Sequence, residues 1–495
     1  MKRDTSVIGS FAPFAHRRHG LPFTLATLTA LLGFGLFSNV QAEDWAQFRG
    51  PNCSGISSSK NLPVNFSADN NVSWSHELGD GIACPIIVND RVYITSMVGD
   101  QTFAVICFDA LTGEQLWKNE MVTGPLPGIT PPNSHASSTP AADGERVYVY
   151  FSTLGLLAFS KDGKLEWHRP LPVPEYLLSW GAATSPVLYK DSVIFCQDDD
   201  LFSYVMAVNK KTGEVLWQTE RSDVLGGYAV PLVCPVGDRA EIVVAGSGHL
   251  KGYDSETGKE LWRCNSLLRT VMTTPVFHDG IVYLAIESYG DTDRILKYAL
   301  LQWRDTNQDG AITKDEVPEA FTQKFVRGDV NKDGKLVDDE ITAAFQPTNT
   351  VGGGKVVQAV RVGGSGDVTE SHMVWNLTDT RAPSNLASPL FVNDRLFIVK
   401  KGGISSSFDT NGKKVWYQKR IGNRGNYYAS PVAGDGKIYV PGENGNIVVL
   451  EDGPEMKVLA KNDMGGSLVA TPAIANDRIF VRTRDKLLCV GEQVD

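Results

Sequence analysis

The chain has 495 residues and a formal net charge of −10 at pH 7, and it contains no run of basic residues. Nucleic-acid binding requires clustered Lys and Arg, so this composition excludes nucleic acid as the expected partner. Length alone predicts two or three domains.

The N-terminal segment, residues 1–42, has the pattern of a secretory signal peptide. An apolar run from Leu21 to Phe37 precedes a small-x-small cleavage site, Val40-Gln41-Ala42, so Glu43 is the expected first mature residue. An uncleaved membrane anchor is the alternative. No cysteine lies near the cleavage site, which argues against a lipoprotein, and the residues after Arg17-Arg18 fit a twin-arginine signal poorly. We therefore expect an exported protein with no other apolar stretch long enough to span a bilayer.

A turn followed by a strand that ends in Trp recurs along the chain. Asp and Thr side chains bond to nearby backbone groups in such turns, and Gly supplies the positive φ that closes them. The pattern occurs as DSETGKELW (254–262), DALTGEQLW (109–117) and NKKTGEVLW (209–217), and in shorter form at 160–167 and 409–416. Trp74 and Trp375 end similar strands, so seven of the ten tryptophans share one position. The chain is therefore a repeat protein.

A small residue followed by Pro marks the start of each unit. The eight markers are Cys84-Pro85, Thr139-Pro140, Ser185-Pro186, Val230-Pro231, Thr274-Pro275, Ser388-Pro389, Ser430-Pro431 and Thr471-Pro472. Their spacings are 55, 46, 45, 44, 114, 42 and 41 residues, so the fifth unit carries an insertion of about 70 residues. Without it, each unit has about 48 residues, within the roughly 40–50 of a β-propeller blade.

Each unit predicts four strands. In residues 387–401, two alternating apolar runs are joined by Asn393-Asp394, a hairpin signal; a third strand precedes the turn, and the fourth carries the Trp, which we expect between neighbouring blades. After a polar lead-in (43–70), residues 71–78 resemble a final strand with no blade before it. The last unit, 468–495, has only three strands. We predict that the N-terminal strand completes the last blade and closes the ring.

These eight units resemble the quinoprotein-like β-propeller repeats. The opening WAQFRGP and the later HASSTPAADGERVYVYFSTLGLLAF resemble a bacterial family of secreted propellers in that superfamily. The resemblance implies an all-β, eight-bladed propeller located in the periplasm or outside the cell. The superfamily includes pyrroloquinoline quinone dehydrogenases and a non-enzymatic outer-membrane-assembly scaffold, so the fold does not choose an activity.

The insertion, residues 289–354, changes from strand to helix periodicity and separates blades 1–4 and the start of blade 5 (43–288) from the remainder (355–495). Ile295, Leu296, Ala299, Leu300 and Trp303 fall on one helical face. Two segments, Asp305 to Glu316 and Asp329 to Glu340, match the calcium-loop pattern D-x-[DN]-x-[DN]-G-x5-E. The insertion therefore resembles an EF-hand pair and predicts two bound calcium ions.

Calcium prefers six to eight oxygen ligands, and this spacing supplies them from alternate residues. The expected ligands are Asp305, Asn307, Asp309, the carbonyl of Ala311 and Glu316, then Asp329, Asn331, Asp333, the carbonyl of Lys335 and Glu340. Ile312 and Leu336 suit the short strand pairing between such loops. The loops start only 24 residues apart, so the connecting helix should be short, and Pro318 lies at its beginning. Val337 occupies the ninth position of the second loop, where a polar residue often holds a water, so this site should be the weaker one. A solvated acidic turn without metal is the alternative.

The insertion follows the second strand of its blade, so it should emerge on the face that carries the central funnel. Residues just before the proline markers are candidates to line this funnel: His135, Trp180, Tyr228, Arg269, Arg424 and Tyr427. Aromatic and Arg side chains around an axis favour an anionic or planar ligand, or a peptide; loop packing is the alternative for each. If the insertion packs on the funnel rim, calcium would change access to it; otherwise its apolar stripe is only its own core.

Two functional hypotheses remain. The first is an exported, calcium-binding scaffold propeller for protein interaction or ligand binding. The second is a quinoprotein dehydrogenase that uses pyrroloquinoline quinone. Such dehydrogenases commonly carry adjacent cysteines beside the quinone, and none of the seven cysteines here is adjacent to another. The cysteines read as small buried residues with no assignable disulfide. We find no nucleophile–His–acid set and no zinc spacing among the eight histidines. An enzyme of another kind is a third option.

Overall fold

The computed structural model describes residues 44–176, 179–268, 270–288, 300–301, 304–317, 319–344 and 353–491. All of them belong to one unit, Ala42–Asp495. The expected signal peptide, Arg269 and most of the apolar stripe (Ile295, Leu296, Ala299 and Trp303) lie outside the described residues. Within the described residues, no helix is long and apolar enough to cross a bilayer.

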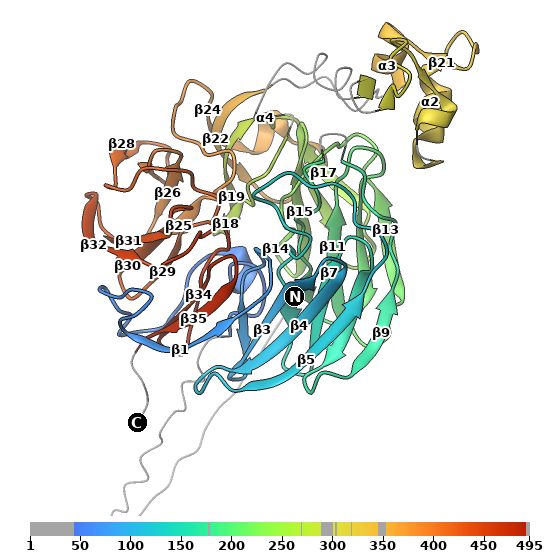
Figure 1. Cartoon of the computed structure of the whole chain (residues 1–495). Helices are drawn as coiled ribbons and strands as arrows, with labels where there is room; N and C mark the ends of the chain where they lie inside the picture. Colours follow the sequence, from blue (N-terminus) through green and yellow to red (C-terminus); the bar gives the residue numbers. More distant parts are fainter. Residues whose placement is uncertain are drawn as a thin grey trace, which may run out of the picture. The chain divides into compact units, whose positions relative to one another are not determined.

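Eight sheets surround a central axis, which confirms the eight-bladed propeller (Figure 1). Blade 1 contains β2 (Ile86–Val88), β3 (Arg91–Gly99), β4 (Thr102–Asp109) and β5 (Gln115–Val122). Blade 2 contains β6 (Ala141–Ala142), β7 (Arg146–Phe151), β8 (Gly155–Ser160) and β9 (Leu165–Arg169). Blade 3 contains β10 (Val187–Tyr189), β11 (Ser192–Gln197), β12 (Tyr204–Asn209) and β13 (Val215–Glu220). Blade 4 contains β14 (Leu232–Val236), β15 (Arg239–Gly246), β16 (His249–Asp254) and β17 (Glu260–Cys264).

The second half of the ring repeats this order. Blade 5 contains β18 (Val276–His278), β19 (Ile281–Ser288), β22 (Gly354–Arg361) and β24 (Met373–Leu377). Blade 6 contains β25 (Leu390–Val392), β26 (Arg395–Lys400), β27 (Ile404–Asp409) and β28 (Lys414–Arg420). Blade 7 contains β29 (Val432–Gly434), β30 (Lys437–Pro441), β31 (Asn446–Glu451) and β32 (Lys457–Asp463). Blade 8 contains β33 (Ala473–Ala475), β34 (Arg478–Arg482), β35 (Lys486–Val490) and β1 (Val72–Glu77).

The N-terminal strand closes the ring as predicted. β1 pairs antiparallel with β35, and Trp74 lies opposite Cys489; Figure 1 shows blue β1 beside red β35. Burial follows position within a blade: the third strand of blade 1, β4, is buried along its centre, whereas the outermost strand, β5, alternates between exposed and half-buried residues. An inner strand is covered on both faces by neighbouring blades, and an outer strand only on one, so the sequence alternates only at the rim.

The repeated Trp connects five of the blades to the next blade by a hydrogen bond. Its indole Nε1 donates to a carbonyl oxygen in the following turn in these pairs: Trp74–Ala110, Trp117–Lys161, Trp167–Lys210, Trp217–Ser255 and Trp375–Thr410. Trp262 and Trp416 instead donate to Glu241 and Ser405 of their own blades, because blades 5 and 7 lack the TG turn. The expected packing of the Trp between neighbouring blades is therefore observed.

The lead-in runs along the propeller axis, which its polar composition did not predict. Trp45 pairs with Ile87 of β2, and the Ala46 carbonyl accepts from Ala142 of β6. The side chain of Asn52 exchanges two hydrogen bonds of 2.9 Å with the Val233 backbone in β14. The lead-in also contacts Leu188, Pro389 and Ala433 through Gln47, Arg49 and Gly55. A single segment thus connects the inner strands of blades 1, 2, 3, 4, 6 and 7, and it includes the short 3-10 helix η1 (Pro51–Cys53).

The insertion leaves blade 5 after Ser288 and returns at Gly354. Its described elements are β20 (Ile312–Thr313), η2 (Lys314–Glu316), η3 (Glu319–Phe321), α2 (Thr322–Gly328), β21 (Lys335–Leu336) and α3 (Asp338–Ala344). β20 and β21 form a two-stranded antiparallel sheet in which Ile312 pairs with Leu336, as the loop pattern predicts. Past the third strand of blade 5, β23 (Gly366–Asp367) pairs in parallel with β17, and α4 (Thr369–His372) follows.

Candidate functional site

The small residues before the marker prolines surround one central pocket. Each blade contributes one of these residues to the lining: Cys84, Thr139, Ser185, Val230, Thr274, Ser388, Ser430 and Thr471. Backbone N–H groups and side chains form a ring there: Cys84 N–H donates to Thr139 Oγ1 at 3.1 Å, Thr139 N–H to Ser185 Oγ at 3.0 Å, and Thr471 N–H to Cys84 Sγ at 3.2 Å. The same bond joins Val230–Thr274, Thr274–Ser388, Ser388–Ser430 and Ser430–Thr471. The ring is open only where Ser185 faces Val230, which has no side-chain oxygen.

Aromatic and apolar side chains shape this central pocket, which has a volume of about 510 Å³. Phe48 from the axial lead-in contributes to its lining, together with Trp180, Tyr228 and Tyr428. None of its described lining residues carries a charged side chain. The pocket is therefore suited to an uncharged, partly aromatic group rather than to an anion or a metal ion.

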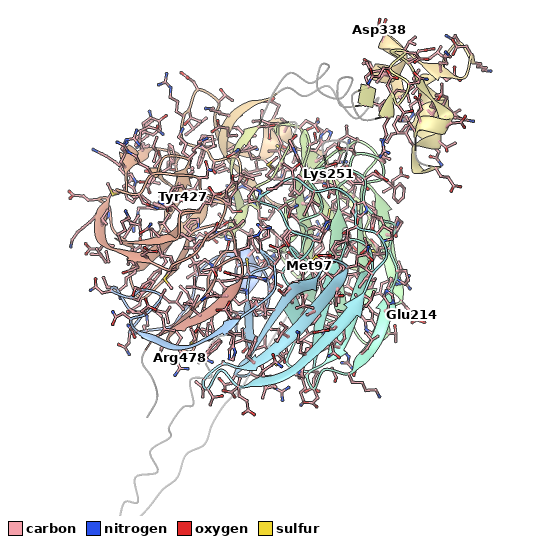
Figure 2. All side chains as sticks on the ribbon, viewed as in Figure 1. Met97, Glu214, Lys251, Asp338, Tyr427 and Arg478 are labelled. Carbon is pink, nitrogen blue, oxygen red and sulfur yellow. The ribbon has the colours of Figure 1, made fainter. Side chains whose placement is uncertain are left out.

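The predicted funnel residues divide into several locations. Trp180 and Tyr228 line the central pocket, whereas His135 lines a neighbouring pocket. Tyr427 is instead buried in the core of blades 6 and 7, where its hydroxyl donates to the Asn423 carbonyl at 2.9 Å; it is labelled in Figure 2. Its neighbour Tyr428, absent from the prediction, lines the pocket.

Arg424 is not among the residues that line either pocket. Arg424 is exposed, and its carbonyl accepts a hydrogen bond from the Asn444 side chain. Arg269 lies outside the described residues. Phe48 is the lining residue that the sequence pattern did not reveal, although the concentration of Trp45, Phe48 and Arg49 in a polar lead-in is a signal for burial.

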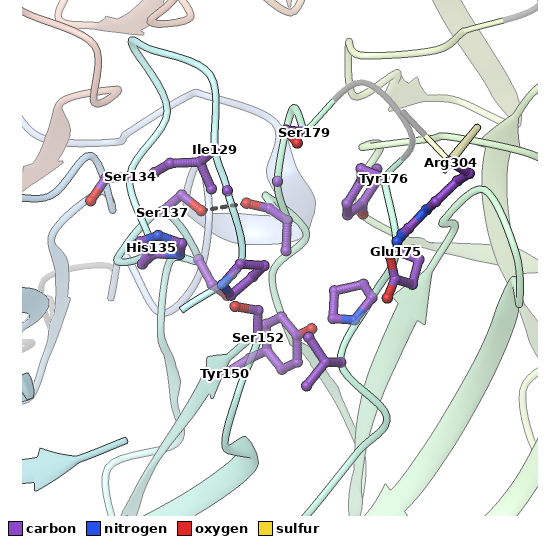
Figure 3. Close-up of a pocket in the computed structure, with 17 residues that line it drawn as sticks. Ile129, Ser134, His135, Ser137, Tyr150, Ser152, Glu175, Tyr176, Ser179 and Arg304 are labelled. Atoms are coloured by element: carbon purple, nitrogen blue, oxygen red, sulfur yellow. Dashed lines mark hydrogen bonds and ion pairs between the residues drawn. The ribbon is translucent and has the colours of Figure 1, made fainter. Parts of the chain in front are cut away.

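A second pocket lies beside the first, and we call it the inter-blade pocket (Figure 3). The loops before β6 and β10 form its walls, and it has a volume of about 260 Å³. Tyr176 lines the inter-blade pocket and Tyr228 the central one; their rings stack 5.4 Å apart and form part of the partition between the two. Arg304 from the insertion also lines it, and its Nη2 lies 2.8 Å from the Glu175 carboxylate.

In the first predicted calcium loop, carboxylate oxygens accept hydrogen bonds from backbone N–H groups. Asp305 Oδ2 accepts from Gly310 N–H at 2.8 Å, and Gly310 has the positive φ (79°) that the sharp turn requires. Glu316 accepts from the N–H groups of Thr306 and Thr313 at 3.0 and 2.9 Å. The Thr313 bond is the main reason that the pKa of Glu316 falls to about 2. Glu316 is therefore ionised at neutral pH.

The second loop repeats these contacts and leaves one oxygen unpaired. Gly334, with φ 82°, donates to Asp329 Oδ2 at 3.2 Å. Asp329 Oδ1 is buried and has no hydrogen-bond partner among the described residues. A buried carboxylate oxygen without a donor is costly unless a cation approaches it. In the described part of the chain, no three His, Cys, Asp or Glu side chains already converge on one point, so metal binding would require these carboxylates to turn inward.

The insertion contacts blade 3, two blades from the one that carries it. Leu201, in the loop between β11 and β12, and Leu225, in the loop after β13, share a buried cluster with Phe321, Phe325 and other apolar residues of the insertion. Both loops open on the same face as the central pocket, because strand order places second-to-third and fourth-to-first connections there. The predicted position of the insertion on the funnel face is consistent with these contacts.

A buried carboxylate organises this contact surface. Asp199 accepts from Leu201 N–H at 2.8 Å and from Glu175 N–H at 3.2 Å, so it joins the two loops that touch the insertion. Burial raises the pKa of Asp199 to about 7, despite these hydrogen bonds. Lys324 of α2 is only 8% exposed, and its pKa is lowered chiefly by burial.

All seven cysteines are buried free thiols, as expected for small core residues. Burial raises the pKa of Cys53 and of Cys107 to about 12, so neither is a thiolate at neutral pH. Cys84, at the central pocket, also has a raised pKa because it is buried. These thiols are therefore poor nucleophiles.

Comparison with known proteins yields one family and several solved structures. The family model described as outer membrane protein assembly factor BamB matches residues 58–197, 201–337 and 400–495. The curated outer membrane protein assembly factor BamB of Francisella salina is 24% identical over 172 residues, which span 33% of this chain and only 30% of that protein.

Among solved structures, BamB from Moraxella catarrhalis has a TM-score of 0.51 at 14% identity and covers 86% of this chain and 98% of its own. Quinohemoprotein alcohol dehydrogenase from Comamonas testosteroni has a TM-score of 0.54 at 11% identity, with 92% and 81% covered. A europium-containing methanol dehydrogenase has a TM-score of 0.53 at 10% identity, with 89% and 90% covered. At these identities the likeness shows the fold alone.

Proposed function

Because the chain belongs to the propeller family described as outer membrane protein assembly factor BamB, we propose that it is an exported, calcium-binding scaffold that holds a segment of another protein in its central pocket. The observation that carries this proposal is the central pocket itself. It combines Trp180, Tyr228 and Tyr428 with small hydroxyl residues, and its described lining has no charged side chain. Aromatic residues and Met are enriched at protein interfaces, whereas charges are depleted at their centres. An apolar or aromatic side chain of an extended partner segment fits this chemistry.

The ring of hydrogen bonds around the central pocket, which we call the hydroxyl ring, supports a role in binding rather than in catalysis. Its Ser and Thr oxygens already accept hydrogen bonds from backbone N–H groups of the preceding blade, and the described lining residues include no acid or base that could activate them. Nucleophilic catalysis requires a base within hydrogen-bond reach of the nucleophile. We therefore assign the ring to inter-blade structure and the aromatic side chains to recognition.

Pyrroloquinoline quinone does not fit the described lining of this pocket. The quinone carries several carboxylates, which require Arg or Lys partners, and a dehydrogenase would also need a base and metal-binding acids. The described lining supplies none of these, and Cys84, its single thiol, is protonated at neutral pH. The dehydrogenase alternative therefore receives no support from the residues at the pocket.

Calcium fits the loops of the insertion. Loop one would use Asp305, Asn307, Asp309, the Ala311 carbonyl and Glu316, and loop two Asp329, Asn331, Asp333, the Lys335 carbonyl and Glu340. The unpaired, buried Asp329 Oδ1 and the short sheet that joins the loops support this assignment. In an exported protein, weak sites with dissociation constants on the order of 10⁻⁴ to 10⁻³ M would suffice.

Site-specific photo-crosslinking in the native cell tests the binding role. A photoreactive residue is placed at Trp180 or Tyr428, and a matched control is placed at Glu214, which is labelled in Figure 2. Glu214 is exposed in the turn between β12 and β13, and strand order places this turn on the face opposite to the pocket. We expect one defined protein adduct from the two pocket positions and none from Glu214. Equal adducts at all three positions, or none at the pocket, would reject the proposal.

A reconstitution assay tests the alternative function. The purified chain is supplied with pyrroloquinoline quinone and calcium, and dye reduction is followed with alcohols and sugars. Sustained turnover would overturn the scaffold proposal. Identification of the mature N-terminus by mass spectrometry tests export, with Glu43 as the expected first residue.

A further inference from the structure

The inter-blade pocket has no part in the proposed docking of a protein segment, yet it is a well-formed site. Two loops of the propeller and one residue of the insertion enclose it (Figure 3). Its volume of about 260 Å³ is near the lower end of ligand pockets, which start at roughly 300 Å³. The space therefore suits a small molecule rather than a peptide.

The charges at this pocket cancel. Arg304 and Glu175 lie 2.8 Å apart and neutralise each other. Burial lowers the pKa of His135, so the imidazole is uncharged at neutral pH. A free anion would have to displace Glu175 from Arg304, and a free cation would have to displace Arg304 from Glu175. The pocket therefore disfavours charged ligands of either sign.

Polar and apolar groups contribute about equally to the lining, and most of its remaining polar groups are hydroxyls. Ser134, Ser137, Ser138, Ser152 and Ser179 all contribute to it, together with two tyrosines. Ser138 is 6% exposed, and its Oγ is buried without a partner among the described residues. Figure 3 shows Ser134 and His135 on one side of the pocket, Glu175 and Arg304 on the other, and Ser152 between them. The Tyr150 and Ser137 hydroxyls already donate to Gln197 and to the Ala182 carbonyl. The Ser138 and Ser152 hydroxyls, the Glu175 carboxylate and the Arg304 guanidinium can bond to a ligand that has several hydroxyls.

From this arrangement, we propose that the inter-blade pocket binds a small, uncharged, polyhydroxylated ligand of monosaccharide size, with Arg304 of the insertion as its outer wall. Ser152 and Ser138 lie at the inner side, and Glu175 accepts from ligand hydroxyls while Arg304 holds the carboxylate in place. Sites that hydrogen-bond several hydroxyls discriminate strongly against analogues that lack them, because their own polar groups are then left unpaired.

The insertion links this pocket to calcium, a step that rests on the proposed calcium loops. Arg304 directly precedes Asp305, the first expected ligand of loop one. A calcium ion on Asp305 would fix the backbone from which Arg304 reaches Glu175. Coupling between two binding sites is reciprocal, so a ligand that tightens on calcium binding must tighten calcium binding by the same factor.

The test is calorimetry on the full mature chain with glucose, N-acetylglucosamine and glycerol as probes, with and without saturating calcium. We expect saturable binding of at least one sugar, weaker by roughly tenfold in Glu175→Gln or Arg304→Ala, since each loses a charged hydrogen-bonding group. Ser152→Ala removes a single hydroxyl from the propeller side of the pocket, so it should weaken sugar binding less and affect the insertion less. Glu214→Gln, an exposed substitution remote from the pocket, should bind as the unaltered chain does.

Absence of saturable binding for all three probes would overturn the site, as would equal affinity in the Glu175, Arg304 and Glu214 variants. Sugar affinity that is the same with and without calcium would overturn the coupling. Calcium titration without sugar separates the two proposals: normal calcium binding with no sugar binding rejects only this inference, and absent calcium binding rejects the calcium role itself. Hydrogen exchange at residues 173–176 with calcium alone gives an independent readout.

Discussion

The indole of Trp217 lies directly against Gly258 in the turn of the next blade. A Cβ atom on Gly258 would come within 2.3 Å of the indole Cε3, while the indole Nε1 donates to Ser255 in the same turn at 3.1 Å. Gly258 also has a φ of +71°, which side chains disfavour. This close Trp–turn contact therefore requires glycine, which has no side chain, at position 258.

The first prediction concerns this contact. Gly258→Ala should lower the free energy of unfolding by about 2–4 kcal/mol, because it adds a steric clash to an unfavourable φ. Gly237→Ala is the matched control: its φ is +60°, but no atom lies within 4 Å of the new Cβ, so only the conformational cost of about 1 kcal/mol applies. Urea denaturation measures both, and equal losses would contradict the steric explanation.

The second prediction concerns the hydroxyl ring and uses two substitutions, one that removes a hydrogen-bond acceptor and one that adds an acceptor. Thr274→Val removes the acceptor of the buried Val230 N–H and should cost about 1–3 kcal/mol. Val230→Thr offers an acceptor where the ring is open, beside Ser185, and should recover up to about 1 kcal/mol. Both substitutions keep the side-chain shape. If denaturation shows the same sign for the two, the ring does not stabilise the blades through these bonds.

The third prediction concerns calcium. Glu316→Gln and Glu340→Gln should each remove one site in calorimetry, and the double variant should remove both. The Lys335 ammonium lies 3.6 Å from Asp309 Oδ2 of the other loop and opposes a cation there. Lys335→Met should therefore tighten loop one by up to about fivefold at low salt. Lys332→Met is the control: Lys332 lies on the same loop but forms no ion pair with loop one among the described residues, so its replacement should change affinity less.

Asp199 provides the fourth prediction. Its pKa is about 7 in the folded chain and 3.8 ordinarily, so between these values the folded chain retains a proton that the unfolded chain has lost. Stability should fall as pH rises through this window, by up to about 1.4 kcal/mol per pH unit for one group, and level off above pH 7. Asp199→Asn should remove this slope; its one carbonyl oxygen can still accept from Leu201 N–H, whereas its NH2 group cannot accept from Glu175 N–H. Denaturation midpoints from pH 5 to 8 measure it, and parallel slopes would contradict the assignment.

Strand order was predictable from the sequence because its signals repeat. The marker Pro recurs in all eight units and the Trp and the TG-like turn in most of them, each with one geometric reason, so blade number, closure by β1 and the Ile312–Leu336 pairing follow from spacing. The pocket lining was less predictable, because it lies in loops with no period. Tyr427 and Tyr428 are neighbours in the sequence. The hydrogen bond from Tyr427 to the Asn423 carbonyl holds Tyr427 in the core, so Tyr428 is the one that lines the pocket.

Contacts between distant parts of the chain also escaped prediction. The lead-in is polar and rich in Gly and Ser, yet it supplies the exact donors and acceptors that the inner strands leave unpaired along the axis. Nothing in the loops of blade 3 indicates that Leu201 and Leu225 are covered by an insertion from blade 5. Such pairings depend on three-dimensional proximity rather than on local pattern.

The axial lead-in and the closing strand have a kinetic consequence. Residues 45–77 contact the inner strands of blades 1, 2, 3, 4, 6 and 7 and pair with β35, so this segment, which is synthesised early, can take its final position only after the last blade has formed. Contacts of such long sequence separation slow folding, because the chain must lose loop entropy before they form. They also hinder unfolding, because no blade can separate while the lead-in stays bound along the axis and β1 stays paired with β35. The ring should therefore survive long dilution and protease challenge once formed, out of proportion to its equilibrium stability.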